Sequence, residues 1–321
     1  MYHTPRFEQL FCQHPLGTYN MAYTEWGDPH NPKVLLCVHG LLRTGRDFDV
    51  LAQALSQHYR VVCPDIVGRG RSDWLTDHNY YVIPQYVGDV MQLIHHLQPH
   101  QLDWVGTSMG GLIGLSLAAA LVYTPEPSSS SIGAAWGVPP AISLGKMVLN
   151  DVGPTLNKSG LDRIAQYMQA QLQQRFASFE EAVSYSQQQW RGFGPHSLDQ
   201  WQHLTRYVLK NEQGQWFYNY DPGIAQAFFD QVHAVDPTQL AQAQQIAEQL
   251  LWQGFESLSA PCLIVHGADS DLLSTATVQQ MMQRQPLAQV YTVQGVAHAP
   301  TLMQADQVQA VVDFLLKDSN L

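Results

Sequence analysis

The sequence predicts an α/β fold in which a parallel β-sheet is covered by helices on both faces. Continuous apolar runs such as Val34–Val38 alternate with segments of helical periodicity such as Tyr86–Leu97, a pattern that is typical of strands buried on both sides. Residues 155–250 differ, because they carry helical patterns and no buried strand run. We therefore expect a core of residues 1–154 and 251–321, with residues 155–250 inserted as a helical cap (lid) domain.

Composition limits the class of protein and its partners. The chain has 321 residues, of which 45% are apolar and 13% charged, so it can bury a large globular core. A formal net charge of −11 argues against a nucleic-acid or anionic-membrane partner. No apolar run is long enough to span a bilayer, and the first residues lack the layout of a signal peptide, so we expect a cytoplasmic protein. The four cysteines show no CxxC spacing, and we expect them to be reduced core residues.

The core elements are expected where apolar runs and amphipathic segments end at turn residues. The expected strands are Phe7–Cys12, Asn20–Trp26, Val34–Val38, Arg60–Cys63, Trp104–Val105, Lys146–Asn150, Cys262–His266 and Gln289–Val293, the first two forming an antiparallel ribbon. The expected helices are Phe48–Leu55, Tyr86–Leu97, the segment after Ser108, Thr275–Gln283 and Gln307–Leu316 in the core, and Leu161–Phe176, Phe179–Trp190, Trp201–Leu209 and Thr238–Leu251 in the cap. Residues 124–145, rich in Pro, Ser, Gly and Ala, predict a loop on the side of the sheet away from catalysis.

A candidate nucleophile lies at the turn between the Trp104–Val105 strand and the following helix. Gly106-x-Ser108-x-Gly110 is typical of a nucleophile elbow, in which a sharp turn exposes the serine hydroxyl at the sheet edge. Glycine fits the flanking positions because side chains there would collide with the strand and helix. The helix start directs free amides at the reaction centre, so the Met109 N–H is expected to form half of an oxyanion hole. The alternative is a glycine-rich turn whose serine only caps the helix.

A serine nucleophile needs a base and an orienting carboxylate at the same sheet edge. His298 follows the last expected strand and is the candidate general base. Three aspartates follow strands, namely Asp151, Asp269 and Asp271. We favour Asp271 as the triad acid because it precedes Leu272-Leu273 and the expected helix cap Ser274, which suits an anchored loop. Asp269 and Asp151 remain alternatives, and the aspartates not used would be turn or cap residues.

The loop after the Val34–Val38 strand is expected to complete the oxyanion hole. Leu41 N–H is the candidate second donor, with Leu42 as the alternative. Arg43 and Arg46, in the same loop, are candidates to pair with a substrate carboxylate, although exposed loop arginines are more common. Trp74 is a further candidate for a pocket wall.

The cap is rich in large apolar side chains, most of which are expected to form its own core while some face the cleft. These residues are Trp190, Phe193, Trp201, Tyr207, Trp216, Phe217, Tyr218, Phe228 and Phe229. Apolar walls favour an acyl or aryl group over a sugar or peptide.

Four motifs together resemble the α/β-hydrolase superfamily: the elbow, His39-Gly40, Asp65-x-x-Gly68-x-Gly70-x-Ser72 and Gly295-x-x-His298. The resemblance covers residues 20–154 and 255–318 and is closest to bacterial carboxylesterase-like hydrolases. It implies an eight-stranded, mostly parallel sheet with a cap inserted after strand six. The family acid usually lies three residues after the strand-end glycine, which here is Ser270 with an aspartate on each side. Similar haloalkane dehalogenases and epoxide hydrolases use aspartate as nucleophile, so Ser108 disfavours both.

The expected function is that of a serine hydrolase that cleaves a small-to-medium apolar carboxylic ester through an acyl-enzyme. Ser108 attacks, His298 moves the proton, Asp271 orients the imidazole, and the amides of Leu41 and Met109 bind the oxyanion. Neither a cofactor nor a metal is expected, and the expected partner is a small-molecule ester. The alternatives are a C–C bond hydrolase or lactonase of aromatic or cyclic compounds, and a non-catalytic ligand receptor of the same fold.

Overall fold

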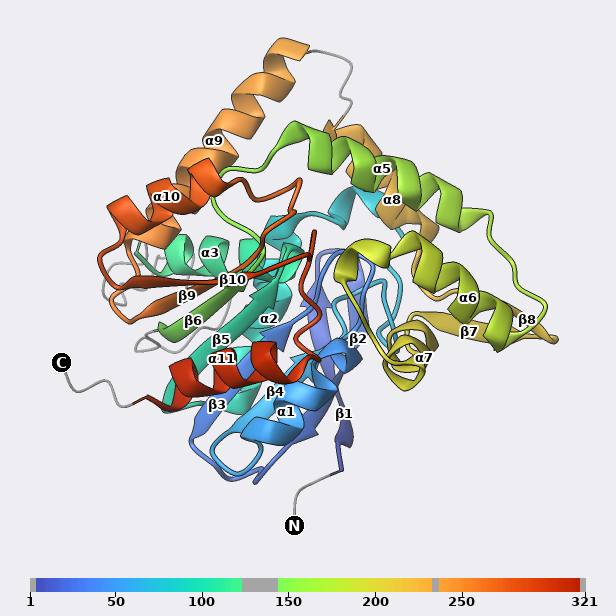
Figure 1. Cartoon of the computed structure of the whole chain (residues 1–321), viewed down its shortest axis with the longest axis horizontal. Coiled ribbons are helices and arrows are strands. Elements are labelled where there is room, and N and C mark those ends of the chain that lie inside the picture. Colours follow the sequence, from blue (N-terminus) through green and yellow to red (C-terminus); the bar gives the residue numbers. More distant parts are fainter. Residues whose placement is uncertain (1–3, 123–143, 233–236, 318–321) are drawn as a thin grey trace.

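An eight-stranded β-sheet forms the centre of the molecule (Figure 1). The computed structural model describes residues 4–122, 144–232 and 237–317, so residues 124–143 of the expected loop lie outside the described residues. The strands are β1 (Arg6–His14), β2 (Gly17–Trp26), β3 (Lys33–Val38), β4 (Arg60–Pro64), β5 (Gln101–Thr107), β6 (Leu144–Asn150), β9 (Cys262–Gly267) and β10 (Ala288–Val293).

The sheet order is β1-β2-β4-β3-β5-β6-β9-β10. The pairs β1–β2 and β2–β4 are antiparallel, and all other neighbours are parallel. This confirms the mostly parallel, eight-stranded sheet. It also places β5 directly between β3 and β6, so the loops that follow these three strands meet at one edge of the sheet.

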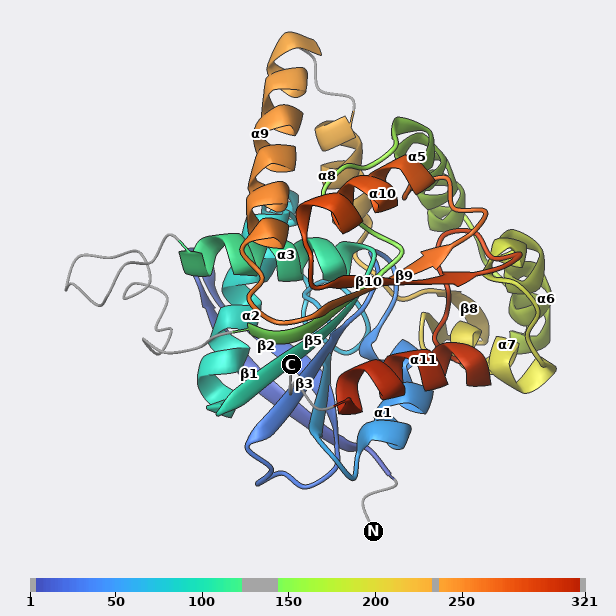
Figure 2. The same ribbon diagram turned by 60° about the vertical axis from the view of Figure 1, so that its left-hand side comes forward.

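Helices cover both faces of the sheet, as both views show (Figures 1 and 2). One face packs against α1 (Asp49–Leu55) and α11 (Ala305–Leu316). The other face packs against α2 (Ile83–Leu97), α3 (Met109–Val122), the C-terminal part of α9 (Pro237–Glu256) and α10 (Thr275–Arg284). A short 3₁₀ helix, η1 (Gly45–Phe48), leads into α1, and another, η2 (His78–Tyr80), precedes α2.

Close backbone contacts fix α3 against the strands that carry the site. A Cβ at Gly110 would lie 1.9 Å from the carbonyl oxygen of Val38, at the end of β3. The indole of Trp104, fully buried on β5, donates to the Gly110 carbonyl oxygen at 3.1 Å. Only glycine permits this approach. The start of α3 is thus held against the ends of β3 and β5.

The segment between β6 and α9 forms a separate group of elements beside the core (Figure 1). Its helices are α5 (Lys158–Leu172), α6 (Phe179–Gln189), the short η3 (Arg191–Phe193), α7 (Leu198–Arg206) and α8 (Pro222–Val232). We call residues 158–232 the helical layer. It also contains an antiparallel hairpin of β7 (Leu209–Glu212) and β8 (Gln215–Tyr218), which the sequence pattern did not predict.

The sequence signal for the hairpin lies in its turn, because its strands carry no buried apolar run. Its strands are four residues long and mostly not buried, so no buried run marks them. The turn residues Gln213 and Gly214 both have positive φ, 52° and 84°, as a tight two-residue hairpin turn requires. The sequence Gln-Gly was therefore the available signal.

Helix α9 links the helical layer to the core. It extends to Glu256, past the boundary expected at residue 250. Near its end, Phe255 is fully buried, and a Cβ at Gly254 would lie 2.0 Å from the carbonyl oxygen of Leu115 on α3. The expected boundary therefore falls within a helix whose last turns pack on the core.

None of the helices in the described residues combines the length and hydropathy that a membrane span requires.

All four cysteines, Cys12, Cys37, Cys63 and Cys262, are buried and free. Burial raises the pKa of the Cys12 and Cys262 thiols well above the ordinary value, so both remain protonated.

The packing of α9 on α3 predicts the effect of adding one methyl group. Gly254→Ala should lower the free energy of unfolding by about 1–3 kcal/mol, because the new Cβ meets backbone that cannot move aside. On an unpacked helix surface the same substitution would stabilise the protein by about 1 kcal/mol. The sign of the change in the free energy of unfolding therefore distinguishes the two cases. Urea denaturation measures it, with Gln249→Ala on the exposed side of α9 expected to stay within about 0.5 kcal/mol of wild type. A more stable Gly254→Ala variant would contradict the packing.

Candidate active site

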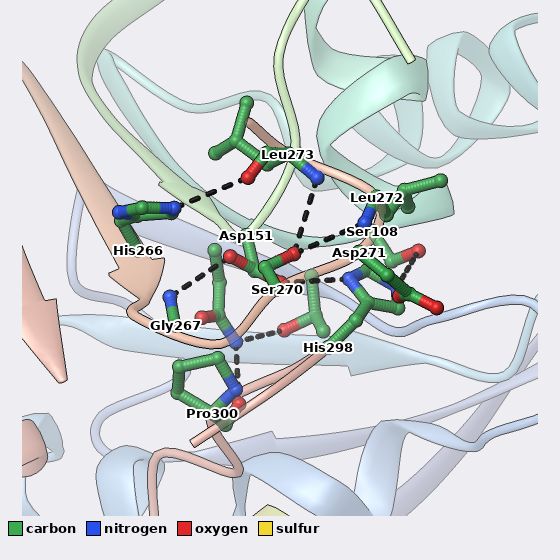
Figure 3. A network of polar contacts seen from close by, with 12 residues as sticks. Ser108, Asp151, His266, Gly267, Ser270, Asp271, Leu272, Leu273, His298 and Pro300 are labelled. Atoms are coloured by element: carbon green, nitrogen blue, oxygen red, sulfur yellow. Dashed lines mark hydrogen bonds and ion pairs between the residues drawn. The ribbon is translucent and has the colours of Figure 1, made fainter. Parts of the chain in front are cut away.

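Three loops at the carboxyl edge of the sheet bring a serine, a histidine and an aspartate into one hydrogen-bonded line (Figure 3). Ser108 follows β5, Asp151 follows β6 and His298 follows β10. His298 Nε2 lies 2.9 Å from Ser108 Oγ, and His298 Nδ1 lies 2.9 Å from Asp151 Oδ2. The geometry matches a nucleophile, a base and an orienting acid.

Ser108 is held in a strained turn between β5 and α3. Its φ is +52°, the left-handed region that residues other than glycine rarely adopt. Its amide donates to the Asn150 carbonyl oxygen at 3.0 Å, and its own carbonyl oxygen accepts from the Gly111 amide at 2.8 Å. These bonds hold the strained backbone in place and direct the hydroxyl toward His298.

Asp151 is fully buried and has both carboxylate oxygens occupied. Oδ1 accepts a hydrogen bond from the Gly267 amide at 2.9 Å, and Oδ2 faces His298. The Asp151 amide donates to the Val265 carbonyl oxygen at 2.7 Å. A carboxylate fixed in this way selects the imidazole tautomer with its proton on Nδ1. Nε2 is then free to accept the Ser108 hydroxyl proton.

Asp271, the expected acid, is engaged elsewhere. Its carboxylate forms two hydrogen bonds with Arg163 of α5, at 2.5 Å from Nε and 2.7 Å from Nη2. Arg163 lowers the pKa of Asp271 below its ordinary value. The other alternative, Asp269, is exposed. The prediction that Asp271 bonds to His298 was therefore wrong. Asp151 forms that hydrogen bond instead.

The strand order explains this difference. Strand β6 adjoins β5, so Asp151 leaves the sheet in a buried position beside Ser108. Asp271 lies farther along its loop, where it faces the helical layer and remains partly exposed. The sequence did contain a signal for Asp151, since it follows a buried apolar strand immediately.

A model of the alpha/beta hydrolase family matches residues 35–314. The chain belongs to this family. A 3-hydroxybutyrate-oligomer hydrolase of Cupriavidus necator is 43% identical over 315 residues, covering 97% of this chain and 98% of that protein. An esterase of Mycobacterium tuberculosis is 24% identical over 90% of this chain and 83% of its own length. The crystal structure of an alpha/beta hydrolase from Novosphingobium aromaticivorans has 29% identity and a TM-score of 0.77, covering 97% of this chain and 99% of that one.

In this α/β-hydrolase, the residues expected to donate to the oxyanion lie next to Ser108 in sequence or line the same cavity. Met109 is the first residue of α3, so its amide has no acceptor within the helix. On the other side, a Cβ at Gly40 would lie 3.8 Å from the Ser108 Cβ, and the next residue, Leu41, lines the cavity that contains Ser108.

The Arg69 side chain contacts both of these segments. Its side chain is fully buried, and Nε donates to the Leu41 carbonyl oxygen at 2.8 Å. Nη2 lies 3.6 Å from the Met109 sulfur, and Nη1 donates to the Tyr86 hydroxyl at 3.0 Å. A rigid guanidinium with several fixed acceptors holds both segments in register. The sequence analysis did not single out Arg69.

Two of the quoted motifs support the same loops. His39 Nε2 accepts from the Ile66 amide at 2.9 Å, and burial lowers the pKa of His39 to about 4, so this imidazole stays neutral. Asp65 accepts from the amides of Gly45 and Arg71 at 2.8 and 3.0 Å. Burial raises the pKa of its carboxyl group. These residues are structural, because they tie the loop after β3 to the loop after β4.

Ser108 and His298 lie in the wall of a cavity of about 500 Å³ between the core loops and the helical layer. The cavity is of a size that holds small organic ligands. Of the aromatic residues expected to face a cleft, Trp190, Phe193 and Tyr218 line it. Its walls are mostly apolar, which fits an acyl group better than a sugar or a peptide.

Of the two residues expected to line the pocket, the structure places only Arg43 in the cavity wall. Arg43 lines the cavity, but its guanidinium binds Asp47 through two hydrogen bonds of 2.7 and 2.6 Å. Trp74 does not line it. That indole borders a separate depression of about 90 Å³ and lies under the Lys210 ammonium, 5.2 Å from the ring centroid. The expectation for Trp74 was therefore wrong.

The hydrogen bonds of the three aspartates predict different effects of their substitution on activity. Asp151→Asn should lower kcat by about 10⁴-fold, because an amide at this position favours the wrong imidazole tautomer. Asp271→Asn and Asp269→Asn should each lower kcat by less than about 10-fold. Hydrolysis of p-nitrophenyl butyrate measures the effect, with circular dichroism to verify folding. If Asp271→Asn caused the large loss and Asp151→Asn did not, the assignment would be reversed.

Proposed function

We propose that this α/β-hydrolase is a serine esterase that cleaves short oligomeric esters of a hydroxy acid. The observation that carries the mechanism is the line Asp151–His298–Ser108, with 2.9 Å contacts on both sides of the imidazole, in the wall of an apolar cavity. The observation that supports the substrate is the 43% identity, over nearly the whole length of both chains, to a hydrolase of 3-hydroxybutyrate oligomers.

Acylation follows from the hydrogen bonds. Ser108 Oγ attacks the ester carbonyl carbon while its proton passes to His298 Nε2, and the carbonyl π electrons move to oxygen. The amides of Leu41 and Met109 bind that oxyanion. When the bond between the carbonyl carbon and the alcohol oxygen breaks, His298 protonates the departing oxygen. The acyl group remains on Ser108.

Deacylation uses the same residues with water in place of the serine hydroxyl. His298 takes a proton from water, the hydroxide attacks the acyl carbon, and a second tetrahedral species forms in the same oxyanion hole. Its collapse returns the proton to Ser108 Oγ and releases the acid. One ester and one water thus become one acid and one alcohol. Asp151 stabilises the imidazolium in both steps.

An oligoester of a short hydroxy acid suits the cavity. Its units are small and carry apolar methyl and methylene groups, which match walls such as Ile164, Tyr167 and Leu204. The volume of about 500 Å³ accommodates more than one such unit. A simple apolar ester would also bind, since the acyl side of both substrates is alike.

The test is hydrolysis of the linear dimer and trimer of (R)-3-hydroxybutyrate, measured beside p-nitrophenyl acetate, butyrate and octanoate. Wild type should cleave the oligomers, and Ser108→Ala should reduce kcat by about 10⁴-fold or more, because the nucleophile is lost. Ser184→Ala, an exposed hydroxyl on α6, is the matched control and should behave as wild type.

Different results would contradict the serine mechanism, the oligoester substrate and the esterase activity. Retention of most activity by Ser108→Ala would exclude the serine mechanism. Turnover of p-nitrophenyl esters without cleavage of the oligomers would leave an esterase and exclude the oligoester substrate. An enzyme inactive on every ester would favour a C–C bond hydrolase or a ligand receptor.

A further inference from the structure

The cavity contains charged groups that the ester mechanism does not use. Three arginines line it, Arg43, Arg163 and Arg191, and so do three aspartates, Asp47, Asp269 and Asp271. Two ion pairs account for four of these residues: Arg43 binds Asp47, and Arg163 binds Asp271. Arg191 and Asp269 remain.

Arg191 differs from the other two arginines. Its side chain is exposed, and among the described residues its guanidinium has no ion pair, hydrogen bond or ring contact. An arginine with five unused donors in the wall of a mostly apolar cavity is suited to a carboxylate or phosphate group, because the planar fork can bind two oxygens at once.

The backbone beside Arg191 lies against the histidine loop. Arg191 begins the short helix η3, between α6 and α7. The carbonyl oxygen of the next residue, Gly192, accepts a hydrogen bond of 2.7 Å from the amide of Ala297. Ala297 directly precedes His298, and a Cβ at Gly192 would lie 3.1 Å from the Ala297 Cβ. The position of Arg191 is therefore tied to the catalytic base.

The His298 side of the site is where the alcohol half of an ester must lie, because His298 protonates the departing oxygen. In a linear dimer of a 3-hydroxy acid, the alcohol half is itself a hydroxy acid with a free carboxylate. That carboxylate lies four bonds from the scissile carbonyl carbon, about 5 Å away when the chain is extended. An oligoester thus presents an anion on the same side of the scissile bond as Arg191.

We propose that Arg191 binds the terminal carboxylate of a hydroxy-acid oligoester and so places the last ester bond of the chain at Ser108. This inference rests on the proposed function and specifies its substrate further. The product released from the alcohol side is then the carboxyl-terminal hydroxy acid, one unit at a time. Asp269 lines the same cavity, so its negative charge should weaken the binding.

The test compares the (R)-3-hydroxybutyrate dimer with the same dimer whose terminal carboxylate is a primary amide. Wild type should have the higher kcat/KM for the acid. In Arg191→Gln the acid-to-amide ratio of kcat/KM should fall roughly 10-fold or more, mainly through KM for the acid, because a charge-assisted pair is lost. Arg191→Lys should restore part of the ratio, and Asp269→Asn should raise it.

Arg175→Gln is the matched control, because it removes the same charge from the helical layer. Arg175 is exposed and borders the depression beside Trp74, but it does not line the cavity that contains Ser108. Its acid-to-amide ratio should equal that of wild type. An unchanged ratio in Arg191→Gln, or an equal fall in Arg175→Gln, would overturn the proposal.

A second measurement separates this inference from the proposed function. (R)-3-Hydroxybutyrate should inhibit hydrolysis of p-nitrophenyl butyrate competitively, and Arg191→Gln should raise its inhibition constant roughly 10-fold or more. If wild type cleaves neither dimer, the oligoester function fails, and the carboxylate site then depends on this inhibition alone. Inhibition that is absent, or equal in wild type and variant, would exclude the site.

Discussion

The hydrogen-bonded imidazole of His298 is the contact that the arrangement of the site depends on. It joins the ends of three strands, since Asp151 follows β6, Ser108 follows β5 and His298 follows β10. A displacement of any one loop by about 1 Å would break one of the 2.9 Å contacts. The parallel sheet supplies the necessary stiffness, because its hydrogen-bonded strands fix where each loop begins.

Buried polar groups hold the loops around that imidazole. Asp151 is held by the amide of Gly267, and the neutral His39 by the amide of Ile66. Arg69 holds the Leu41 carbonyl without an acidic partner among the residues described. A cation fixed beside the two candidate oxyanion donors favours negative charge at that point. The same groups that stabilise the loops therefore also shape the electrostatic potential of the cavity.

Sequence predicted the local features and missed those that depend on packing. The strand segments, Ser108 and His298 could be inferred because apolar periodicity and strand–turn–helix motifs are short-range signals. The choice between Asp151 and Asp271 could not, because it depends on which strands adjoin and on a partner, Arg163, that lies 108 residues from Asp271 along the chain. Trp74 was misplaced for the same reason.

The proposed mechanism depends on activation of Ser108 by His298. The most direct measurement is mass spectrometry after reaction with a fluorophosphonate probe, followed by digestion. We expect one adduct, on the peptide that contains Ser108, and a labelling rate that falls by orders of magnitude in His298→Ala, because the base no longer removes the hydroxyl proton. Labelling of another residue, or an unchanged rate in His298→Ala, would contradict it.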